Sequence, residues 1–266
     1  MHKFFIINLE RSTDRRAKMQ ANIDKLLREN PDFATQASFE FFKAKDTQSI
    51  IDSGFIKRYS KFRAGVWKAR EVRATELACF ASHFALWKKC VELDEPIFIL
   101  EDDVDFCEDF ARGVDRIAQS GYDFARLSWR TFHTMYLLEE HFALAPSLML
   151  GTSAYYLTPR AARKLIKHAQ SIFVAVDYYV SFSFLHGVKE MLHIPHLVHV
   201  NELDEISTIG KPEHQPRDKS FYLRFVLLRE IHRIYRHARM WIFTRFALLR
   251  LKKRIKARES KRAQTK

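Results

Sequence analysis

The stretch Pro96-Ile97-Phe98-Ile99-Leu100-Glu101-Asp102-Asp103-Val104 decides the fold. Its four consecutive apolar residues predict a buried strand, and the acidic triplet Glu101-Asp102-Asp103 begins where that strand leaves its sheet. In open α/β sheets, ligands bind beyond the carboxyl ends of the strands. We therefore expect a functional site at the acidic triplet, carried on an α/β framework.

Strand and helix patterns alternate on both sides of this stretch. Apolar runs predict strands over residues 3–9, 39–42, 97–100, 124–129 and 148–157. Helical spacing, caps and proline breaks predict helices over residues 13–30, 75–93 and 109–119, and from Pro159 onward. Residues 47–70 read as a loop or irregular segment. The alternating order predicts an α/β sandwich.

The composition is that of a folded protein in a reducing compartment. Hydrophobic residues make up 47% of the 266 residues and aromatic residues 14%, which excludes wholesale disorder. The three cysteines, Cys79, Cys90 and Cys107, are odd in number and form no CxxC pair, which excludes a disulfide framework and suits the cytoplasm. The apolar run of residues 4–7 is too short for a signal peptide. No stretch approaches the roughly 20 apolar residues of a membrane span.

The positive charge is concentrated in a C-terminal tail. Residues 221–266 hold 15 basic and two acidic residues, which accounts for the whole net charge of +13 and leaves a neutral body. Helical spacing places apolar residues on one arc, namely Leu228, Ile231, Tyr235, Ile242, Phe246 and Leu249. It places basic residues on an adjoining arc, namely Arg229, Arg233, Arg236, Arg239 and Arg250. Trp241 and Phe243 suit a headgroup boundary.

This tail predicts an interfacial helix that binds an anionic membrane surface through residues 221–262. One alternative is that the apolar arc packs on the body. Another is that the tail binds nucleic acid, but the body has no matching basic excess, so no nucleic-acid partner is expected. The segment of residues 210–216 contains two prolines and is the best boundary between body and tail.

The acidic triplet suits a divalent cation. Adjacent carboxylates at a strand end need a cation or water to offset their repulsion. Mg²⁺ and Mn²⁺ prefer oxygen ligands, and typically take one or two carboxylates together with substrate phosphates. A metal there neutralises a diphosphate leaving group. The alternatives are a solvated acidic turn that caps the next helix and a metal-dependent phosphohydrolase with the same strand-and-acid pattern.

A series of short motifs then resembles glycosyltransferase family 25. At the N-terminus the matching residues are Phe5-Ile6-Ile7-Asn8-Leu9 with Arg11, Asp14, Arg15 and Arg16, followed by residues 41–46. In the next helix they are Thr75-Glu76-Leu77-Ala78-Cys79, Ser82-His83 and Leu86-Trp87-Lys88. Later matches are Leu100 to Val104, Gly151 to Tyr155 with Ala161, Ala162 and Leu165, Val176-Asp177, and Ser207 to Gly210. Thr75, Ala78 and Lys45 depart from the family pattern, which puts only the local shape in doubt.

The resemblance implies a GT-A-like (Rossmann-like) α/β/α sandwich that binds a nucleotide sugar, with the basic amphipathic helical tail added at the C-terminus. It implies Mn²⁺ or Mg²⁺, a UDP-sugar donor and inversion at the anomeric carbon. In this mechanism, an acceptor hydroxyl attacks the anomeric carbon while UDP leaves. A carboxylate takes the hydroxyl proton, and the metal stabilises the diphosphate.

Candidate catalytic and metal-binding residues follow from the same patterns. Asp103 and Glu101 are the candidate metal ligands, and Asp102 is a candidate for the donor ribose or the metal. His83 is a candidate donor to a phosphate or sugar hydroxyl, with a structural core histidine as the alternative. Asp177 is the candidate general base or acceptor ligand, with a helix N-cap as the alternative. Three acidic residues are rival bases, namely Glu202, Asp204 and Glu205.

Further residues are candidates for binding the donor. Asn8 stands at the end of the first strand, where a nucleotide base would lie, and Asp46 would hold the nucleoside. Arg11 and Arg16 carry forked donors that suit a diphosphate. Glu76 and Ser82 share the helix over residues 75–93 with His83. A turn residue at 8, solvated arginines and a loop aspartate at 46 are the structural alternatives.

Together these patterns predict a catalytic domain over residues 1–215 and a membrane-associating tail over residues 216–266. The expected function is transfer of a hexose, with galactose favoured, from a UDP-sugar to a lipooligosaccharide or lipopolysaccharide acceptor. The enzyme is expected to be cytoplasmic and peripheral on the inner membrane. Both the motif series and the lipid-facing tail are explained by this function, whereas neither alternative class explains both.

Overall fold

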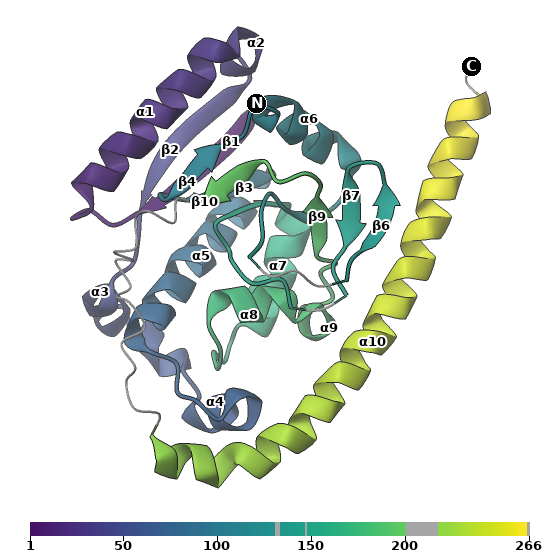
Figure 1. The fold of residues 1–266 in the computed structure, drawn as a ribbon. Coiled ribbons are helices and arrows are strands. Elements are labelled where there is room, and N and C mark those ends of the chain that lie inside the picture. Colours follow the sequence, from purple (N-terminus) through teal and green to yellow (C-terminus); the bar gives the residue numbers. More distant parts are fainter. Residues whose placement is uncertain (131–133, 147, 201–217, 265–266) are drawn as a thin grey trace.

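The computed structural model describes residues 1–130, 134–146, 148–200 and 218–264. These residues form one mixed eight-stranded sheet between two helical layers, with a long helix along one side (Figure 1). The sheet strands, in spatial order, are β2 (Ala37–Lys43), β1 (His2–Asn8), β3 (Ile97–Glu101), β8 (Ala154–Leu157), β5 (Phe124–Arg126), β9 (Met191–His193), β7 (Phe142–Leu144) and β6 (Tyr136–Glu139). A separate antiparallel pair joins β4 (Val104–Phe106) to β10 (Val198–Val200).

The helices cover the sheet and its edges. They are α1 (Thr13–Glu29), α2 (Pro31–Ala34), α3 (Thr47–Asp52), α4 (Lys61–Lys68), α5 (Ala74–Leu93), α6 (Phe110–Ser120), α7 (Pro159–His168), α8 (Val176–Ser181), α9 (Ser183–His186) and α10 (Lys219–Gln264), with a short 3₁₀ helix at Phe55–Arg58. None of the helices in the described residues is both long and apolar enough to cross a bilayer.

The strand that leads into the acidic triplet, β3, has a parallel neighbour on one side and an antiparallel neighbour on the other. β1 lies between β2 and β3 and is parallel to both, with Ile7 of β1 paired to Glu101 of β3. The chain crosses from one side of β1 to the other between β2 and β3, and such a reversal of strand order creates a crevice at the carboxyl ends. β8 runs antiparallel to β3, so the segment before it reaches the same edge, where Glu101 N donates to Ser153 O at 2.8 Å.

Alternate residues of the central strands enter two separate cores. In β3, Phe98 and Leu100 belong to the core beneath α1 and α6, whereas Ile97 and Ile99 belong to the core beneath α5 and α7. A strand covered on both faces needs apolar residues at every position, which explains the unbroken run at residues 97–100. The predicted α/β sandwich is therefore confirmed, and the C-terminal helix is present.

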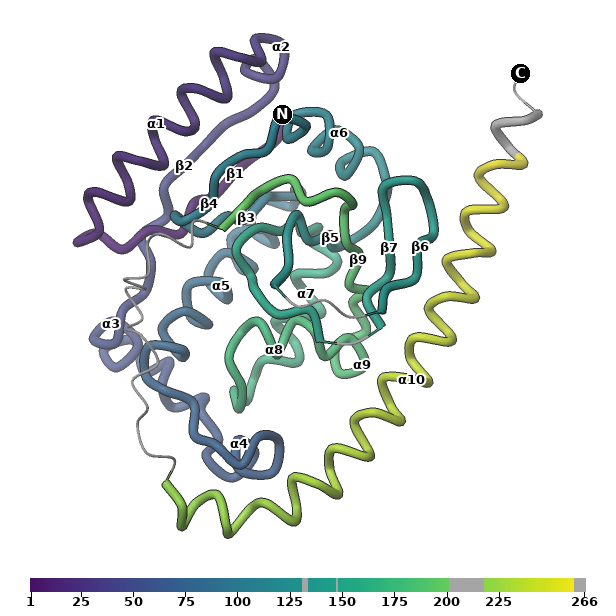
Figure 2. The backbone as a smooth tube through the Cα atoms, in the orientation of Figure 1, coloured from purple at the N-terminus to yellow at the C-terminus, as the bar shows by residue number. Residues whose placement is uncertain are grey.

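The inner face of α10 is part of the fold. Figure 2 shows α10 running from α4 past α9 towards the far end of the molecule. The Phe225 ring packs on α4 so closely that a Cβ added at Gly65 would lie 2.6 Å from it. Ala247, Leu248 and Leu251 enter the core beneath α1 and α6. Arg254 Nη2 donates to Gly121 O at 2.9 Å, beyond α6.

The outer face of α10 carries the predicted apolar arc. Its six residues, Leu228, Ile231, Tyr235, Ile242, Phe246 and Leu249, are between 44% and 66% exposed, and Leu223, Leu227, Ile234 and Trp241 are exposed beside them. The alternative in which this arc packs on the body is therefore wrong, because a second apolar stripe makes those contacts. Phe243 belongs to that inner stripe and packs against both cores.

Two sequence predictions of secondary structure were inaccurate. Residues 47–70 are not a loop, because Asp46 caps α3 in a capping box with Ser49 and Ser60 caps α4. The strands predicted over residues 124–129 and 148–157 shrink to β5 and β8, each confined to its central residues. Before β8, Gly151 has a positive φ of 94°, which is incompatible with a regular strand. The rival bases Glu202, Asp204 and Glu205 and the domain boundary at residues 210–216 lie outside the described residues.

Candidate active site

The carboxyl ends of β1 and β3 are joined through the acidic triplet. Asn8 Nδ2 donates to Asp102 Oδ2 at 2.6 Å, and both side chains are buried. Arg15 of α1 places Nη2 2.6 Å from Asp102 Oδ1 and 3.1 Å from Asp103 Oδ2. Asp102 therefore has a partner on each oxygen, and its role in the structure is to hold β1, α1 and β3 together.

Within the described residues, one carboxylate oxygen of Asp103 has no hydrogen-bond partner. Its Oδ1 is buried and accepts no hydrogen bond within the described residues. The pKa of Asp103 is raised to about 6, chiefly by burial and also by the charges of Glu101 and Asp102, against the lowering effect of Arg15. Burial also raises the pKa of Asp102, while Arg15 and Asn8 oppose this. An orphaned buried oxygen among like charges is a feature that a bound cation explains.

Glu101 is held by a chain of buried polar groups. Thr152 Oγ1 donates to Glu101 Oε1 at 2.9 Å, and His83 Nε2 lies 3.6 Å from the same oxygen. His83 Nδ1 is 2.9 Å from Tyr155 OH, which also accepts from Trp87 Nε1 at 2.9 Å. The Tyr155 proton is then free for Nδ1, which leaves the Nε2 proton directed at Glu101. His83 is fully buried and lies behind Glu101.

Glu101 belongs to two possible donor sets for a metal. The donor atoms of Cys79, His83 and Glu101 lie within 4.8 Å of one another, and this sulfur, nitrogen and oxygen set suits Zn²⁺. Glu101 and Asp103 together offer only oxygens, including the orphaned Oδ1, and this set suits Mg²⁺ or Mn²⁺. The oxygen set is the one that fits the metal expected from the sequence.

Asp177 lies at the start of α8, close to the same carboxylates. Its Oδ1 accepts a hydrogen bond from Tyr178 N at 2.7 Å. The N-cap of α8 is Ala175, so the capping alternative for Asp177 is wrong. Burial raises the pKa of Asp177, and the charges of Glu101 and Glu76 add to this against the effects of the Tyr178 N–H and Arg126. Several carboxylates therefore act on one another across this site.

Cys79 lies where the charges of several carboxylates of this site act together. Burial raises the pKa of the Cys79 thiol well above its usual range, and the charges of Glu101, Asp177, Glu76 and Asp103 raise it in the same direction. The end of β3, the start of α5 and the start of α8 thus converge on one acidic region. The sequence predicted that residues of these three segments share one site, but it did not predict how they are arranged.

Of the arginines in and just before α1, the one that contacts the acidic triplet is not one of the two predicted to bind the donor. Arg16 is exposed and its guanidinium lies 4.2 Å from the centroid of the Phe41 ring, and Arg11 is exposed. Arg15 instead contacts the acidic triplet. The sequence did carry a signal for Arg15. Residues 15, 19, 23 and 26 follow helical spacing, and Met19, Ile23 and Leu26 are the buried residues of α1, so Arg15 shares the face of the helix that packs on the body.

Three other predicted donor-binding residues have structural partners. Asp46 Oδ1 accepts from Ser49 N at 2.8 Å, and this hydrogen bond is the main cause that lowers the pKa of Asp46. Ser82 Oγ accepts from Lys45 N at 2.8 Å and so ties α5 to the end of β2. Glu76 accepts from both terminal nitrogens of Arg70, at 2.8 and 3.1 Å, and from Arg73 N. These hydrogen bonds leave each of the three residues with a structural partner.

The sequence profile described as glycosyltransferase family 25 (LPS biosynthesis protein) matches residues 1–180. This match includes both strand ends, the acidic triplet and Asp177. The chain belongs to glycosyltransferase family 25. The family resemblance found in the sequence is therefore confirmed.

Family 25 relatives come from animals and bacteria. A glycosyltransferase 25 family member of Aedes aegypti is 28% identical over 193 residues, covering 68% of this chain and 30% of the relative. Procollagen galactosyltransferase 2 of Mus musculus is 27% identical over 135 residues, covering 49% and 20%. Lipooligosaccharide biosynthesis protein lic2B of Haemophilus influenzae is 34% identical over 109 residues, covering 39% and 34%. The chain thus matches about a third or less of the length of these relatives.

Proposed function

We propose that this family 25 chain is a metal-dependent, inverting glycosyltransferase with a GT-A-like nucleotide-sugar site. The observation that carries the proposal is the buried Oδ1 of Asp103, which accepts no hydrogen bond within the described residues and belongs to a carboxylate whose pKa the charge of Glu101 raises, at the carboxyl ends of β1 and β3. This is the place where an α/β sheet binds its ligand, and the two carboxylates offer the oxygen donors that Mg²⁺ or Mn²⁺ prefers. A bound cation would supply charge stabilisation to the diphosphate of the leaving nucleotide.

The residues around the cation have distinct tasks in this proposal. Asn8 and Asp102 fix the spacing of the two strand ends, and Arg15 carries positive charge to the edge of the acidic site. His83 is a positioning residue, because it contacts Glu101 from the buried side. Glu76 and Ser82 position α5 against the rest of the crevice. Arg11 and Asp46 lie at the ends of β1 and β2, where the nucleoside and its phosphates would be bound.

Asp177 is the proposed general base. Its raised pKa makes its carboxylate a better proton acceptor, while the hydrogen bond from Tyr178 N fixes its orientation. In the transfer step, the acceptor oxygen forms a bond to the anomeric carbon, and the bond from that carbon to the diphosphate oxygen breaks. The acceptor proton passes to the Asp177 carboxylate, and UDP leaves with the electron pair.

The names of two relatives support the proposed substrate classes. One is a procollagen galactosyltransferase, which supports a UDP-galactose donor, and one acts in lipooligosaccharide biosynthesis, which supports a lipid-linked oligosaccharide acceptor. A lipid-linked acceptor requires the enzyme to work at a membrane surface. We therefore assign residues 1–215 to catalysis and residues 216–266 to membrane association on the cytoplasmic face.

The two faces of α10 support this assignment. The inner face packs on the body, whereas ten large apolar side chains are exposed along the outer face, from Leu223 to Leu249. Residues 221–266 also carry 15 basic side chains against two acidic ones. An apolar face bordered by cations is suited to the interface of an anionic membrane.

The proposal is tested by following UDP release from a panel of UDP-sugars with Mn²⁺ or Mg²⁺, with and without chelator and acceptor glycolipid. We expect release from one donor, UDP-galactose, that requires the metal and increases with acceptor. In Asp177→Asn, kcat should fall by about 10²-fold or more with the affinity for UDP retained, as expected for loss of a general base. Release of inorganic phosphate without sugar transfer would instead establish a phosphohydrolase.

A further inference from the structure

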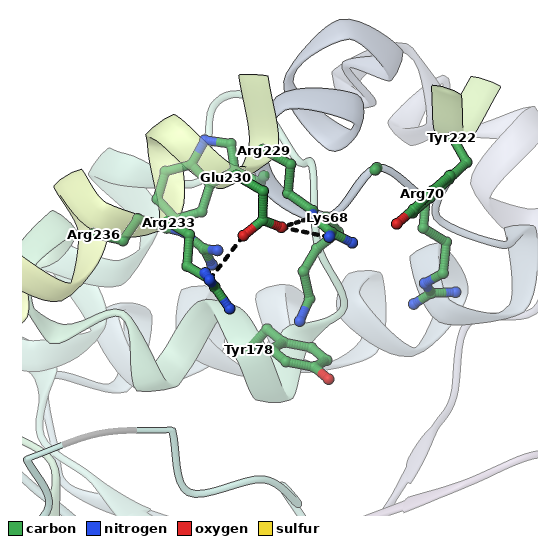
Figure 3. Close-up of a pocket in the computed structure, with 10 residues that line it drawn as sticks. Lys68, Arg70, Tyr178, Tyr222, Arg229, Glu230, Arg233 and Arg236 are labelled. Carbon is green, nitrogen blue, oxygen red and sulfur yellow. Dashed lines mark hydrogen bonds and ion pairs between the residues drawn. The ribbon is translucent and has the colours of Figure 1, made fainter. Parts of the chain in front are cut away.

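A cationic pocket lies between α10 and the body, apart from the acidic triplet. It has a volume of about 380 Å³ and is lined by the end of α4, the start of α8 and the first half of α10 (Figure 3). This volume falls within the range of about 300–1,000 Å³ that is typical of small-ligand sites. Within the described residues, its lining includes nothing from β1 or β3, so it is separate from the proposed metal ligands.

Positive charge dominates the lining of this pocket. The basic residues are Lys68, Arg70, Arg229, Arg233 and Arg236, and Glu230 is the acidic one. Arg229 Nε donates to Glu230 at 2.8 Å, and Arg233 Nη2 lies 2.9 Å from the same carboxylate, as the dashed lines in Figure 3 show. Arg70 is instead bonded to Glu76. Within the described part of the chain, Lys68 and Arg236 have no carboxylate partner.

Burial and neighbouring positive charges disfavour the charged forms of Lys68 and Arg236 in the pocket. Lys68 Nζ lies 3.5 Å from the centroid of the Tyr178 ring. The pKa of Lys68 is lowered to about 8, chiefly by burial and also by the charges of Arg236 and Arg70. Burial also lowers the pKa of Arg236, whose Nε is buried and donates no hydrogen bond within the described residues. A bound anion would relieve both effects.

The donor types and their surroundings indicate which anion fits. Arginine forks and a lysine ammonium are the side chains that recognise phosphate groups through charge-assisted hydrogen bonds. Tyr178 and Tyr222 add flat apolar faces beside these cations, which suit an organic group attached to the phosphate. The pocket thus fits a phosphate ester better than a bare inorganic ion.

The pocket lies between the proposed general base and the proposed membrane face. Tyr178 directly follows Asp177 in α8, and the charge of Asp177 acts on Lys68 by raising its pKa. On the other side, the segment of α10 that lines the pocket carries exposed Leu227 and Ile231 on its outer face. An acceptor that rises from a membrane towards Asp177 would pass this pocket.

We propose that the pocket binds a phosphate group of the acceptor, so that the acceptor is a phosphorylated saccharide. Identifying the ligand as the acceptor rests on the proposed transferase function. The existence of an anion site rests only on the pocket itself, and the two parts are tested separately.

The first experiment is calorimetric titration of glucose 1-phosphate and of glucose into the full-length protein, with UDP and Mn²⁺ present to occupy the donor site. We expect binding of glucose 1-phosphate and none of glucose. Arg236→Gln and Lys68→Met should each weaken binding by about tenfold or more. Arg250→Gln is the matched control, because Arg250 is an exposed arginine of α10 outside the pocket. Equal binding by wild type, Arg236→Gln and Lys68→Met, with the fold intact by circular dichroism, would overturn the proposal.

A second arm separates a saccharide phosphate from a lipid headgroup. Vesicles of phosphatidylcholine and phosphatidylglycerol should bind Arg236→Gln and wild type with equal affinity, because the outer face of α10 makes the membrane contact. Loss of vesicle binding in Arg236→Gln, with no binding of glucose 1-phosphate to wild type, would assign the pocket to lipid and overturn the saccharide proposal. A protein that binds glucose 1-phosphate but releases no UDP would instead contradict the transferase function alone.

Discussion

Asn8 and Asp102 form a buried hydrogen bond of 2.6 Å that joins the carboxyl ends of two parallel strands. Because both side chains are buried, loss of the amide donor leaves a buried carboxylate oxygen unsatisfied. Asn8→Ala should therefore destabilise the protein by about 1–3 kcal/mol. Urea unfolding measures this. Gln48→Ala is the control, since it removes an exposed amide hydrogen bond and should change stability by about 0.5 kcal/mol or less. Equal stability of Asn8→Ala and wild type would contradict this role.

The choice between the two donor sets predicts the metal preference. If Glu101 and Asp103 hold a hard cation, Cys79→Ser should bind Mn²⁺ with an affinity within about threefold of wild type, because Mn²⁺ does not need sulfur. Glu101→Gln should lose Mn²⁺ binding in the same titration. Calorimetry with UDP and Mn²⁺ makes the comparison. Preferential Zn²⁺ binding that disappears in Cys79→Ser would establish the sulfur-containing set instead.

His186 makes the stability of the fold depend on pH. Its Nε2 lies 3.2 Å from the carbonyls of Tyr179 and Val180, and Val188 N donates to Nδ1 at 3.2 Å, so the neutral ring satisfies both nitrogens. Burial lowers the pKa of His186 to about 4, despite the carbonyls, which raise it. In the unfolded chain its pKa is about 6.5, so between pH 6.5 and 4 the unfolded state binds the extra proton.

Stability should therefore fall as the pH decreases through this window, by about 2 kcal/mol between pH 7 and pH 5 from this residue alone. Thermal or urea unfolding of wild type and His186→Gln at both pH values isolates the effect. The glutamine variant cannot gain a proton, so its stability should change less over the interval. Parallel losses in the two proteins would show that other groups cause the acid sensitivity.

The sequence located the central strands because their signals are local. Residues 97–100 read as a buried strand since both faces of β3 are covered, and the same argument holds for β1. β7 and β9 have three residues each, and their pairing joins segments about 50 residues apart. No local sequence pattern therefore predicts them. The helices at residues 47–68 were missed because their caps, rather than their apolar periodicity, define them.

The acidic triplet could be located from sequence, whereas its surroundings could not. Asp102 and Asp103 follow a strand, and strand ends are where ligands bind, but the assignment of Arg15 to these carboxylates depends on how α1 packs. The cationic pocket combines residues near 68, 178 and 230, which meet only through the docking of α10. The exposure of one face of α10 follows from the same docking.

The outer face of α10 predicts membrane binding that needs both charge and apolar surface. Leu227 and Ile234 are each 71% exposed, and replacing both with glutamate should reduce sedimentation with phosphatidylglycerol vesicles by about tenfold or more. The matched control is Leu137→Glu, which alters an apolar residue that is 64% exposed on β6. Wild-type binding should weaken as salt rises, because cations of α10 outside the pocket, such as Arg224, Arg239 and Arg245, are exposed. Equal binding of Leu137→Glu and the α10 variant would contradict the assignment of this face.

The most direct test of the acidic site is metal-dependent UDP release from UDP-galactose by wild type and Asp103→Asn. Asn keeps the shape of the side chain but removes the charge that the proposed cation needs. We predict that Asp103→Asn loses activity by about 10²-fold or more while Asp24→Asn, an exposed carboxylate change on α1, retains it. If Asp103→Asn releases UDP at the wild-type rate with the same dependence on Mn²⁺, the acidic triplet is not the metal site and the proposed mechanism is wrong.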